Sequence, residues 1–147
     1  MMHTVGMDIL RPVVALAGWT MVMWLWMYAR RLPAIAQLPK SEAPGADQGW
    51  TGAKLEDLLP REVQWAAHNY NHLHEAPTVF YAVALILALV GAGDGLNATL
   101  AWVYVGLRVV HSLWHATVNK VAQRFLLFTL SSLVLITLVV RAALVLY

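Results

Sequence analysis

Long apolar segments constrain this chain more than any other feature. Residues 13–29, 97–118 and 122–146 are long and mainly apolar. Residues 79–90, the second apolar segment along the chain, follow directly on a polar stretch. A helix that crosses the hydrocarbon core of a membrane needs about 20 mainly apolar residues. The chain also has 60% hydrophobic and 12% charged residues, whereas a soluble domain has about 25% charged residues. We therefore expect an integral membrane protein.

Four such spans nearly exhaust the 147 residues, so no separate soluble domain is expected. We predict an all-α fold, a four-helix antiparallel bundle, in one transmembrane domain over residues 1–147. Pro60 suits the start of the second helix, and Pro77 is expected to kink that helix, because it removes a backbone hydrogen bond. The predicted spans are residues 11–30, 61–91, 97–118 and 122–146, with a cytoplasmic loop over residues 31–60, which includes a short helix around residues 55–59.

The distribution of Lys and Arg predicts the orientation, because cytoplasmic loops carry an excess of basic residues. The long loop and its flanks, with the link between the last two spans, carry Arg30, Arg31, Lys40, Lys54, Arg61, Lys120 and Arg124. Only Arg11 and Arg141 border the other side. We expect the long loop and that link in the cytoplasm, and both termini outside it. Because the basic residues border membrane segments, we expect no nucleic-acid partner.

The chain has no cysteine. This excludes disulfides, thiolate metal sites and a cysteine nucleophile. Any thiol chemistry must therefore use a thiol that a substrate brings.

A polar stretch, residues 68–77, leads directly into the second apolar segment. His68, His72 and Glu75 lie at positions i, i+4 and i+7 of the expected helix, and Asn69 lies beside them. Ionisable side chains in a span are expensive and usually face a protein interior. We expect this stretch to form part of a site.

The third span carries a matching polar stripe. Arg108, His111, His115 and Asn119 follow at i, i+3, i+7 and i+11, which places them on one helical face. This face should turn away from lipid. The two polar stripes are expected to meet each other or a shared ligand.

Two readings of these stripes need no organic ligand. Polar groups between membrane helices can serve as hydrogen-bond links of about 0.6–2 kcal/mol each. Alternatively, the spacing of His68, His72 and Glu75, with His111 and His115, suits a histidine-carboxylate metal site. The metal content of a double variant of His72 and His111 would test the second reading.

Three motifs together resemble a known family. They are Asn69-x-x-x-Leu73-x-Glu75-x-Pro77-x-x-Phe80-Tyr81, Arg108-x-x-His111-Ser112 and Asn119-x-x-x-x-Arg124-Phe125. They look like the MAPEG family, the membrane-associated proteins in eicosanoid and glutathione metabolism, and more narrowly its bacterial branch. The resemblance extends over nearly the whole chain.

The resemblance implies a homotrimer in the bacterial inner membrane that binds glutathione between neighbouring subunits near the cytosolic face. It implies glutathione-dependent transfer to lipophilic electrophiles or reduction of hydroperoxides, with the lipophilic substrate entering from the lipid. Carried over, Arg30 would hold a glutathione carboxylate, Glu75 the γ-glutamyl amine, and Arg108 a carboxylate or Glu75. Arg124 would be the catalytic cation that stabilises the thiolate. The other predicted glutathione-binding residues are His68, Asn69, His72, His111 and His115.

Four of these positions depart from the family pattern. His68 and His72 replace an arginine and an asparagine of many members, and His111 and His115 replace tyrosines. Histidine keeps hydrogen-bonding capacity, but its charge depends on pH. A non-catalytic MAPEG-fold scaffold, which serves another membrane protein, is therefore the alternative function.

Overall fold

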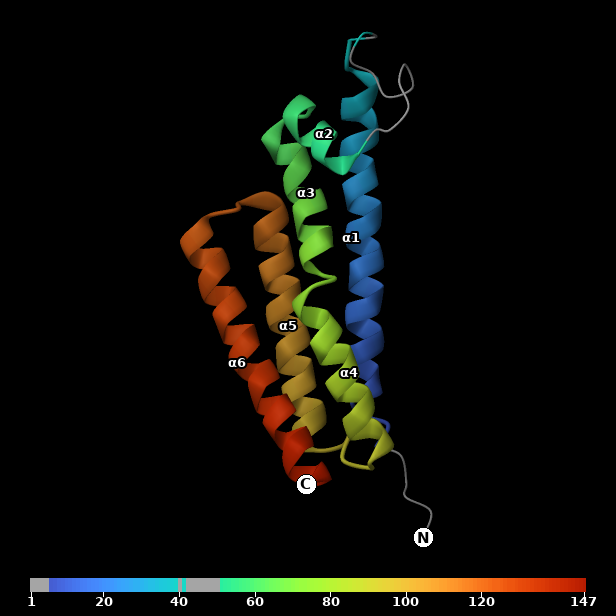
Figure 1. The fold of residues 1–147 in the computed structure, drawn as a ribbon, viewed down its shortest axis with the longest axis vertical. Helices are drawn as coiled ribbons and strands as arrows, with labels where there is room; N and C mark the ends of the chain where they lie inside the picture. The colour runs from blue at the N-terminus through green and yellow to red at the C-terminus, as the bar shows by residue number, and fades with distance from the viewer. Residues whose placement is uncertain (1–5, 40, 42–50) are drawn as a thin grey trace.

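The computed structural model describes residues 6–39, 41 and 51–147, and every regular element in these ranges is an α-helix. Lys40 and most of the middle of the predicted loop lie outside the described residues. In chain order the helices are α1 (Leu10–Ala36), α2 (Gly52–Leu58), α3 (Arg61–His72), α4 (Ala76–Leu89), α5 (Leu96–Thr117) and α6 (Val121–Leu146). Figure 1 shows α1, the consecutive pair α3 and α4, α5 and α6 side by side as four rods.

Three segments are long and apolar enough to cross a membrane. They are Leu10–Ala36, Arg61–Leu89 and Val121–Leu146. Helix α5 has 22 residues but is not one of them, and it carries the predicted stripe of Arg108, His111 and His115. The membrane class of the chain follows from the three apolar segments.

Apolar side chains from four helices make the core. Leu16 and Met23 of α1, Phe80 of α4, Tyr104 of α5 and Leu138 of α6 are all at most 1% exposed. Large apolar side chains also remain exposed along every rod, for example Leu25, Leu85, Val110 and Ile136. A protein that faces lipid needs apolar side chains both in its interior and on its outer surface, and these helices have both.

The first helix extends beyond its predicted span. Helix α1 continues to Ala36 and includes Pro33 in its last turns, so the predicted loop over residues 31–60 contains the end of α1 and all of α2. A hydrogen bond of 2.7 Å from Arg31 Nη2 to Gln64 Oε1 joins this extension to α3. Gln64 Nε2 in turn donates to the Leu55 carbonyl of α2 at 2.6 Å. These two bonds hold three helices together.

The predicted second helix is two helices. Helix α3 ends at His72 and α4 begins at Ala76, so the chain breaks over residues 73–75 rather than bending at Pro77. Pro77 lies in the first turn of α4. Proline fits there because it lacks an N–H, and it disfavours the helical conformation of the residue before it. The break leaves carbonyl groups of α3 available to other partners.

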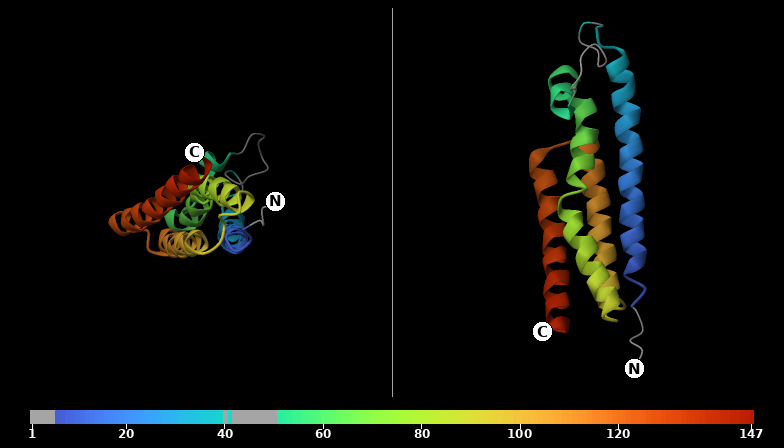
Figure 2. Two further views of the ribbon diagram at one scale, coloured as in Figure 1. Left: turned by 90° about the horizontal axis from the view of Figure 1, so that it is seen from below. Right: turned by 45° about the vertical axis from the view of Figure 1, so that its right-hand side comes forward.

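One end of the molecule gathers segments that lie far apart in the sequence. The beginning of α1, the α4–α5 turn and the end of α6 lie together there, whereas α2 and the α5–α6 link lie at the opposite end (Figures 1 and 2). Gly6 N–H donates to the Ala88 carbonyl at 3.0 Å, and Ile9 N–H donates to the Gly93 carbonyl at 2.9 Å. These bonds fasten the segment before α1 to the α4–α5 turn.

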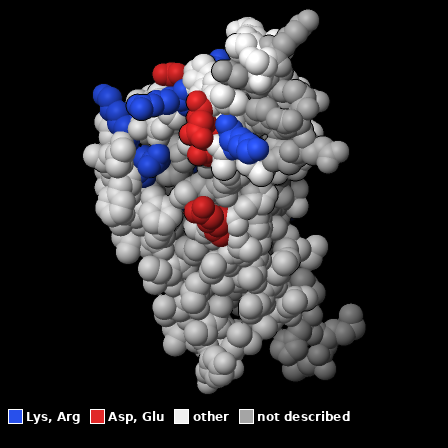
Figure 3. Space-filling model, turned by 45° about the horizontal axis from the view of Figure 1, so that its top comes forward, with Lys and Arg blue, Asp and Glu red and all other residues white. Residues whose placement is uncertain are grey.

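Charged side chains gather at the end with α2. Figure 3 shows Lys, Arg, Asp and Glu side chains crowded at this end and few on the flank below it. The charged residues of these elements are Lys54, Glu56, Asp57, Arg61, Glu62, Lys120 and Arg124. This is the polar end of the molecule, and the predicted site residues of α3, α5 and α6 lie on the rods that run down from it.

Candidate functional site

Arg108 lies in the centre of the candidate site. Its side chain is 0% exposed, and its Nη2 donates to His72 Nδ1 at 2.8 Å and to the His72 carbonyl at 3.3 Å. A cation near the last carbonyls of a helix is favoured by the helix dipole. Arg108 therefore closes the open end of α3 at the break.

The other two nitrogens of the Arg108 guanidinium make no such bond to the described residues. Arg108 Nε and Nη1 are buried and have no hydrogen-bond partner within the described ranges. Buried donors are normally paired with protein, water or ligand, so each exception asks for an explanation. The predicted contact of Arg108 with Glu75 is not made, because the Glu75 side chain is 69% exposed and its nearest recorded partner is His72 Nε2 at 3.9 Å.

Three histidines pack together beside Arg108. The rings of His72 and His111 stack with centroids 4.9 Å apart and 27° between their planes. His115 meets His72 edge to face at 5.9 Å, and Phe128 of α6 does so at 5.5 Å. His111 Nδ1 and His115 Nδ1 are buried and have no partner in the described part of the chain. The stripe of α5 and the end of α3 thus meet, as two facing polar stripes would.

Asn69 joins the same helices one turn earlier. It is 0% exposed, and its Nδ2 donates to Ser112 Oγ at 2.7 Å. The carbonyl oxygen of its side chain is buried and unpaired among the described residues. Asn69 therefore links α3 to α5 through this hydrogen bond.

A cavity of about 190 Å³ opens beside this cluster. It lies between α3, α5 and the first turns of α6, and its lining comprises His72, His111, Val121, Arg124, Phe125 and Phe128. Figure 1 shows α6 leaning away from α3 at this end. One cation, two imidazoles and two aromatic rings therefore surround the same space.

The α5–α6 link positions the cation of this cavity. Asn119 adopts a left-handed conformation with φ of 52°, which asparagine tolerates better than most residues. Its backbone N–H donates to the Trp114 carbonyl at 2.8 Å, and its Oδ1 accepts from Arg124 Nη1 at 2.6 Å. The turn thus ends α5 and holds the Arg124 guanidinium.

Two predicted site residues lie apart from the cavity. Arg30 is exposed on α1, and α1 and α6 lie on opposite flanks of the molecule in Figure 1. His68 Nε2 contacts Glu56 Oε1 of α2 at 2.9 Å. His68 lines a separate polar cavity of about 400 Å³ with Glu56, Asp57, Arg61, Gln64, Trp65 and Asn119.

Phe128 and the bond made by Ser112 were not predicted from the sequence. Phe128 follows Arg124 by four residues, so helical spacing places it on the same face of α6, and this signal could have identified it. Ser112 appears in the resemblance motif, but its bond to Asn69 depends on how α3 and α5 are rotated against each other. Only the packed structure shows that.

The geometry does not favour the metal reading. No group of three His, Asp or Glu side chains in the described ranges is arranged to hold a metal ion. The stacked rings of His72 and His111 present faces rather than nitrogens to each other. Moreover, the Arg108 guanidinium, which binds His72 Nδ1 at 2.8 Å, would repel a second cation there.

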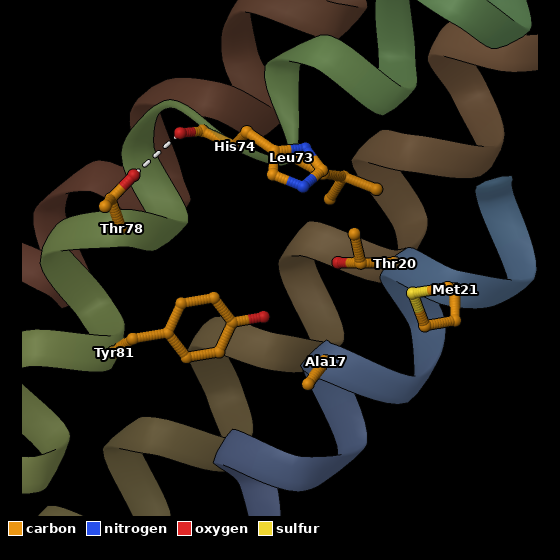
Figure 4. Close-up of a pocket in the computed structure, with 7 residues that line it drawn as sticks. All are labelled: Ala17, Thr20, Met21, Leu73, His74, Thr78 and Tyr81. Atoms are coloured by element: carbon orange, nitrogen blue, oxygen red, sulfur yellow. Dashed lines mark hydrogen bonds between the residues drawn. The ribbon is translucent and has the colours of Figure 1, made fainter.

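A larger, mostly apolar cavity lies elsewhere. It has a volume of about 330 Å³ and lies between α1 and the break between α3 and α4 (Figure 4). Its lining consists of Ala17, Thr20, Met21, Leu73, His74, Thr78 and Tyr81. None of the predicted site residues lines it, so it is not the predicted site.

The chain matches one sequence family. Residues 9–144 match the family model described as the MAPEG family. No curated protein and no solved structure matches the chain significantly.

Proposed function

The chain belongs to the MAPEG family of membrane proteins, and from this premise we propose that it is a glutathione-dependent transferase or peroxidase. Its acceptors would be lipophilic electrophiles or hydroperoxides. One observation carries the proposal: the cavity beside α6 combines Arg124, His72 and His111 with two phenylalanines. That lining suits a soft anion next to an apolar reactant.

The side chains present fit glutathione. Arginine binds carboxylates and other anions through directed N–H groups, and Arg124 supplies such groups at the cavity. The chain has no thiol of its own, and glutathione would supply one. A nearby cation lowers a thiol pKa from about 8.5, which favours the nucleophilic thiolate near neutral pH. We assign that role to Arg124.

The remaining roles follow from where each side chain lies. Glu75 is exposed beside His72 and would accept hydrogen bonds from the amine of the γ-glutamyl group. Arg30 is exposed on α1, which lies on the flank opposite α6 (Figure 1), so it would hold a glutathione carboxylate only where α1 of one subunit faces the cavity of the next. We therefore propose a homotrimer with the site between subunits.

The membrane arrangement belongs to the same proposal. We propose that α5 also crosses the membrane, which makes four spans, because its polar stripe is buried against α3 and α6 while Val103, Val110 and Leu113 face outward. The basic end with α2 and the α5–α6 link would lie in the cytoplasm of a bacterial cell. Both termini would then lie outside the cytoplasm.

Calorimetric titration of glutathione into the purified protein tests this function. We expect saturable heat, together with ultraviolet absorbance of a thiolate that Arg124→Gln removes. Arg141→Gln is the matched control, because Arg141 hydrogen-bonds Asn97 at the opposite end. No heat at millimolar glutathione, with the helical circular dichroism intact, would refute the proposal.

One observation favours the alternative of a non-catalytic scaffold. The Arg108 guanidinium is fully buried and bonded to His72 within the subunit, so it is not open to a ligand in this conformation. A scaffold would show no glutathione binding and would co-purify stably with another membrane protein. The titration and a cross-linking experiment in native membranes distinguish the two functions.

A further inference from the structure

The contact between Arg108 and His72 determines where the proton of His72 lies. A guanidinium has five N–H donors and no acceptor. Because Arg108 Nη2 lies 2.8 Å from His72 Nδ1, Nδ1 must be the unprotonated acceptor. The single ring proton of His72 is then on Nε2.

From this contact we propose that Arg108 is a positioning residue, which fixes the tautomer and orientation of His72 so that Nε2–H is presented as a donor on the side of Glu75. Two bonds from the same Nη2, to the ring and to the carbonyl of His72, hold both the side chain and the end of α3. His111 covers one face of the ring, and Phe128 meets it edge to face. The ring therefore has little freedom to flip.

The charged and titratable groups around His72 come from every neighbouring element. They are Glu75 at the break, Arg108, His111 and His115 on α5, and Arg124 on α6. A proton on Nδ1 would face the Arg108 guanidinium and abolish the bond. Protonation of the ring at Nδ1 is therefore coupled to loss of this Arg108 bond.

His72 lines the same cavity as Arg124, so a fixed Nε2–H on this ring would add a neutral donor to a site that holds one cation. An anionic group, whether a carboxylate or a thiolate, is the ligand that such a pair recognises. This ligand role rests on the proposed function, whereas the tautomer of His72 does not depend on it. The two can be tested separately.

An internal control lies two residues along the chain. His74 is exposed, and its Nδ1 lies 2.9 Å from the Tyr70 carbonyl oxygen. A carbonyl accepts only, so His74 Nδ1 must carry a proton. The structure therefore assigns opposite Nδ1 protonation to two histidines of one short segment.

Nitrogen NMR of protein labelled with ¹⁵N-histidine, without ligand, tests the assignment. We expect an unprotonated Nδ1 and a protonated Nε2 for His72, and a protonated Nδ1 for His74, with the signals identified through His72→Gln and His74→Gln. In Arg108→Met, we expect His72 to exchange between tautomers. A protonated Nδ1 in wild-type His72, or an unchanged His72 signal in a folded Arg108→Met protein, would overturn the proposal.

Two amide variants test the donor role of His72 separately, and the wild-type spectrum still decides the tautomer if Arg108→Met does not fold. The amide of His72→Gln can occupy the Nε2 position, whereas the amide of His72→Asn can occupy only the Nδ1 position. We expect His72→Asn to bind glutathione about tenfold more weakly than His72→Gln. Equal binding by both variants would overturn the donor role. If wild-type protein binds no glutathione, the proposed function fails, and the NMR result still decides the tautomer.

Discussion

Substitutions of Asn119 can separate the effect of backbone strain from the effect of losing a side-chain contact in the candidate site. It has a left-handed φ of 52° and its side chain accepts from Arg124 Nη1 at 2.6 Å. We consider two substitutions, Asn119→Gly and Asn119→Ala. Both remove the acceptor of Arg124, but only glycine adopts positive φ without steric cost.

The two variants should therefore differ in stability. A residue with a Cβ costs about 1–2 kcal/mol in the left-handed region, so the free energy of unfolding of Asn119→Ala should be lower than that of Asn119→Gly by about that amount. The wild type bears less of this steric cost than Asn119→Ala, because asparagine tolerates the left-handed region. Denaturant titration of the detergent-solubilised protein, followed by circular dichroism, measures the difference.

The same variants should lose ligand binding equally. Without Asn119 Oδ1, the half-buried Arg124 guanidinium is no longer held beside the cavity. A hydrogen bond to a charged group is worth about 1.5–3 kcal/mol when buried, and partial exposure reduces this to about 1 kcal/mol. Glutathione affinity should then fall about fivefold in both proteins.

Three results would refute this reasoning. Equal stability of the two variants would show that residue 119 is not held in the left-handed region. Wild-type glutathione affinity in both would show that Asn119 does not position Arg124. A loss of affinity in Asn119→Ala alone would assign the effect to the backbone rather than to the side chain.

Three other predictions concern packing and hydrogen bonds between the helices. In Gly93→Ala, the new Cβ would overlap the backbone carbonyl oxygen of Gly6 and lie 2.7 Å from Ile9 Cγ2, so stability should fall by about 2–3 kcal/mol. Gly106→Ala, with no atom within 4 Å, should leave stability unchanged or raise it by about 1 kcal/mol. Thermal unfolding compares the two variants. Ser112→Ala leaves the buried Asn69 amide without its acceptor and should cost about 1–3 kcal/mol; a denaturation midpoint equal to that of the wild type would contradict this. Gln64→Leu removes the acceptor of Arg31 and the donor to α2, so amide exchange should accelerate in α2 while α4 keeps its protection, as mass spectrometry would show.

The membrane class and most helix positions could be predicted because they depend on local properties. Apolar segments anticipate α5 and α6 to within one residue at each end, and Pro60 anticipates the start of α3 but not its end. The end of α1 differs because Pro33 lies in the last turns of a helix that Arg31 fastens to α3. The chain breaks at residues 73–75, since proline is more favourable in the first turn of a new helix than inside a continuous one.

The site was predictable in its residue types but not in its pairings. The spacing of Arg108, His111 and His115 indicates one inward face, and all three are buried. The resemblance suggested that Arg108 would bind a ligand carboxylate or Glu75, whereas the guanidinium binds His72. Helical spacing does not reveal which group on another helix a side chain will meet.

By itself, the sequence determined what each helix presents, namely apolar faces to lipid and a polar stripe to the interior, and it indicated that a proline disturbs the second helix at residue 77. These follow from chain periodicity and backbone chemistry, which act within a few residues. Only the tertiary structure decided that Arg108 closes the end of α3, that Arg124 shares a cavity with His72, and that Arg30 and His68 lie elsewhere. Those outcomes depend on the rotation and axial offset of neighbouring helices, which the packing of all their side chains sets together.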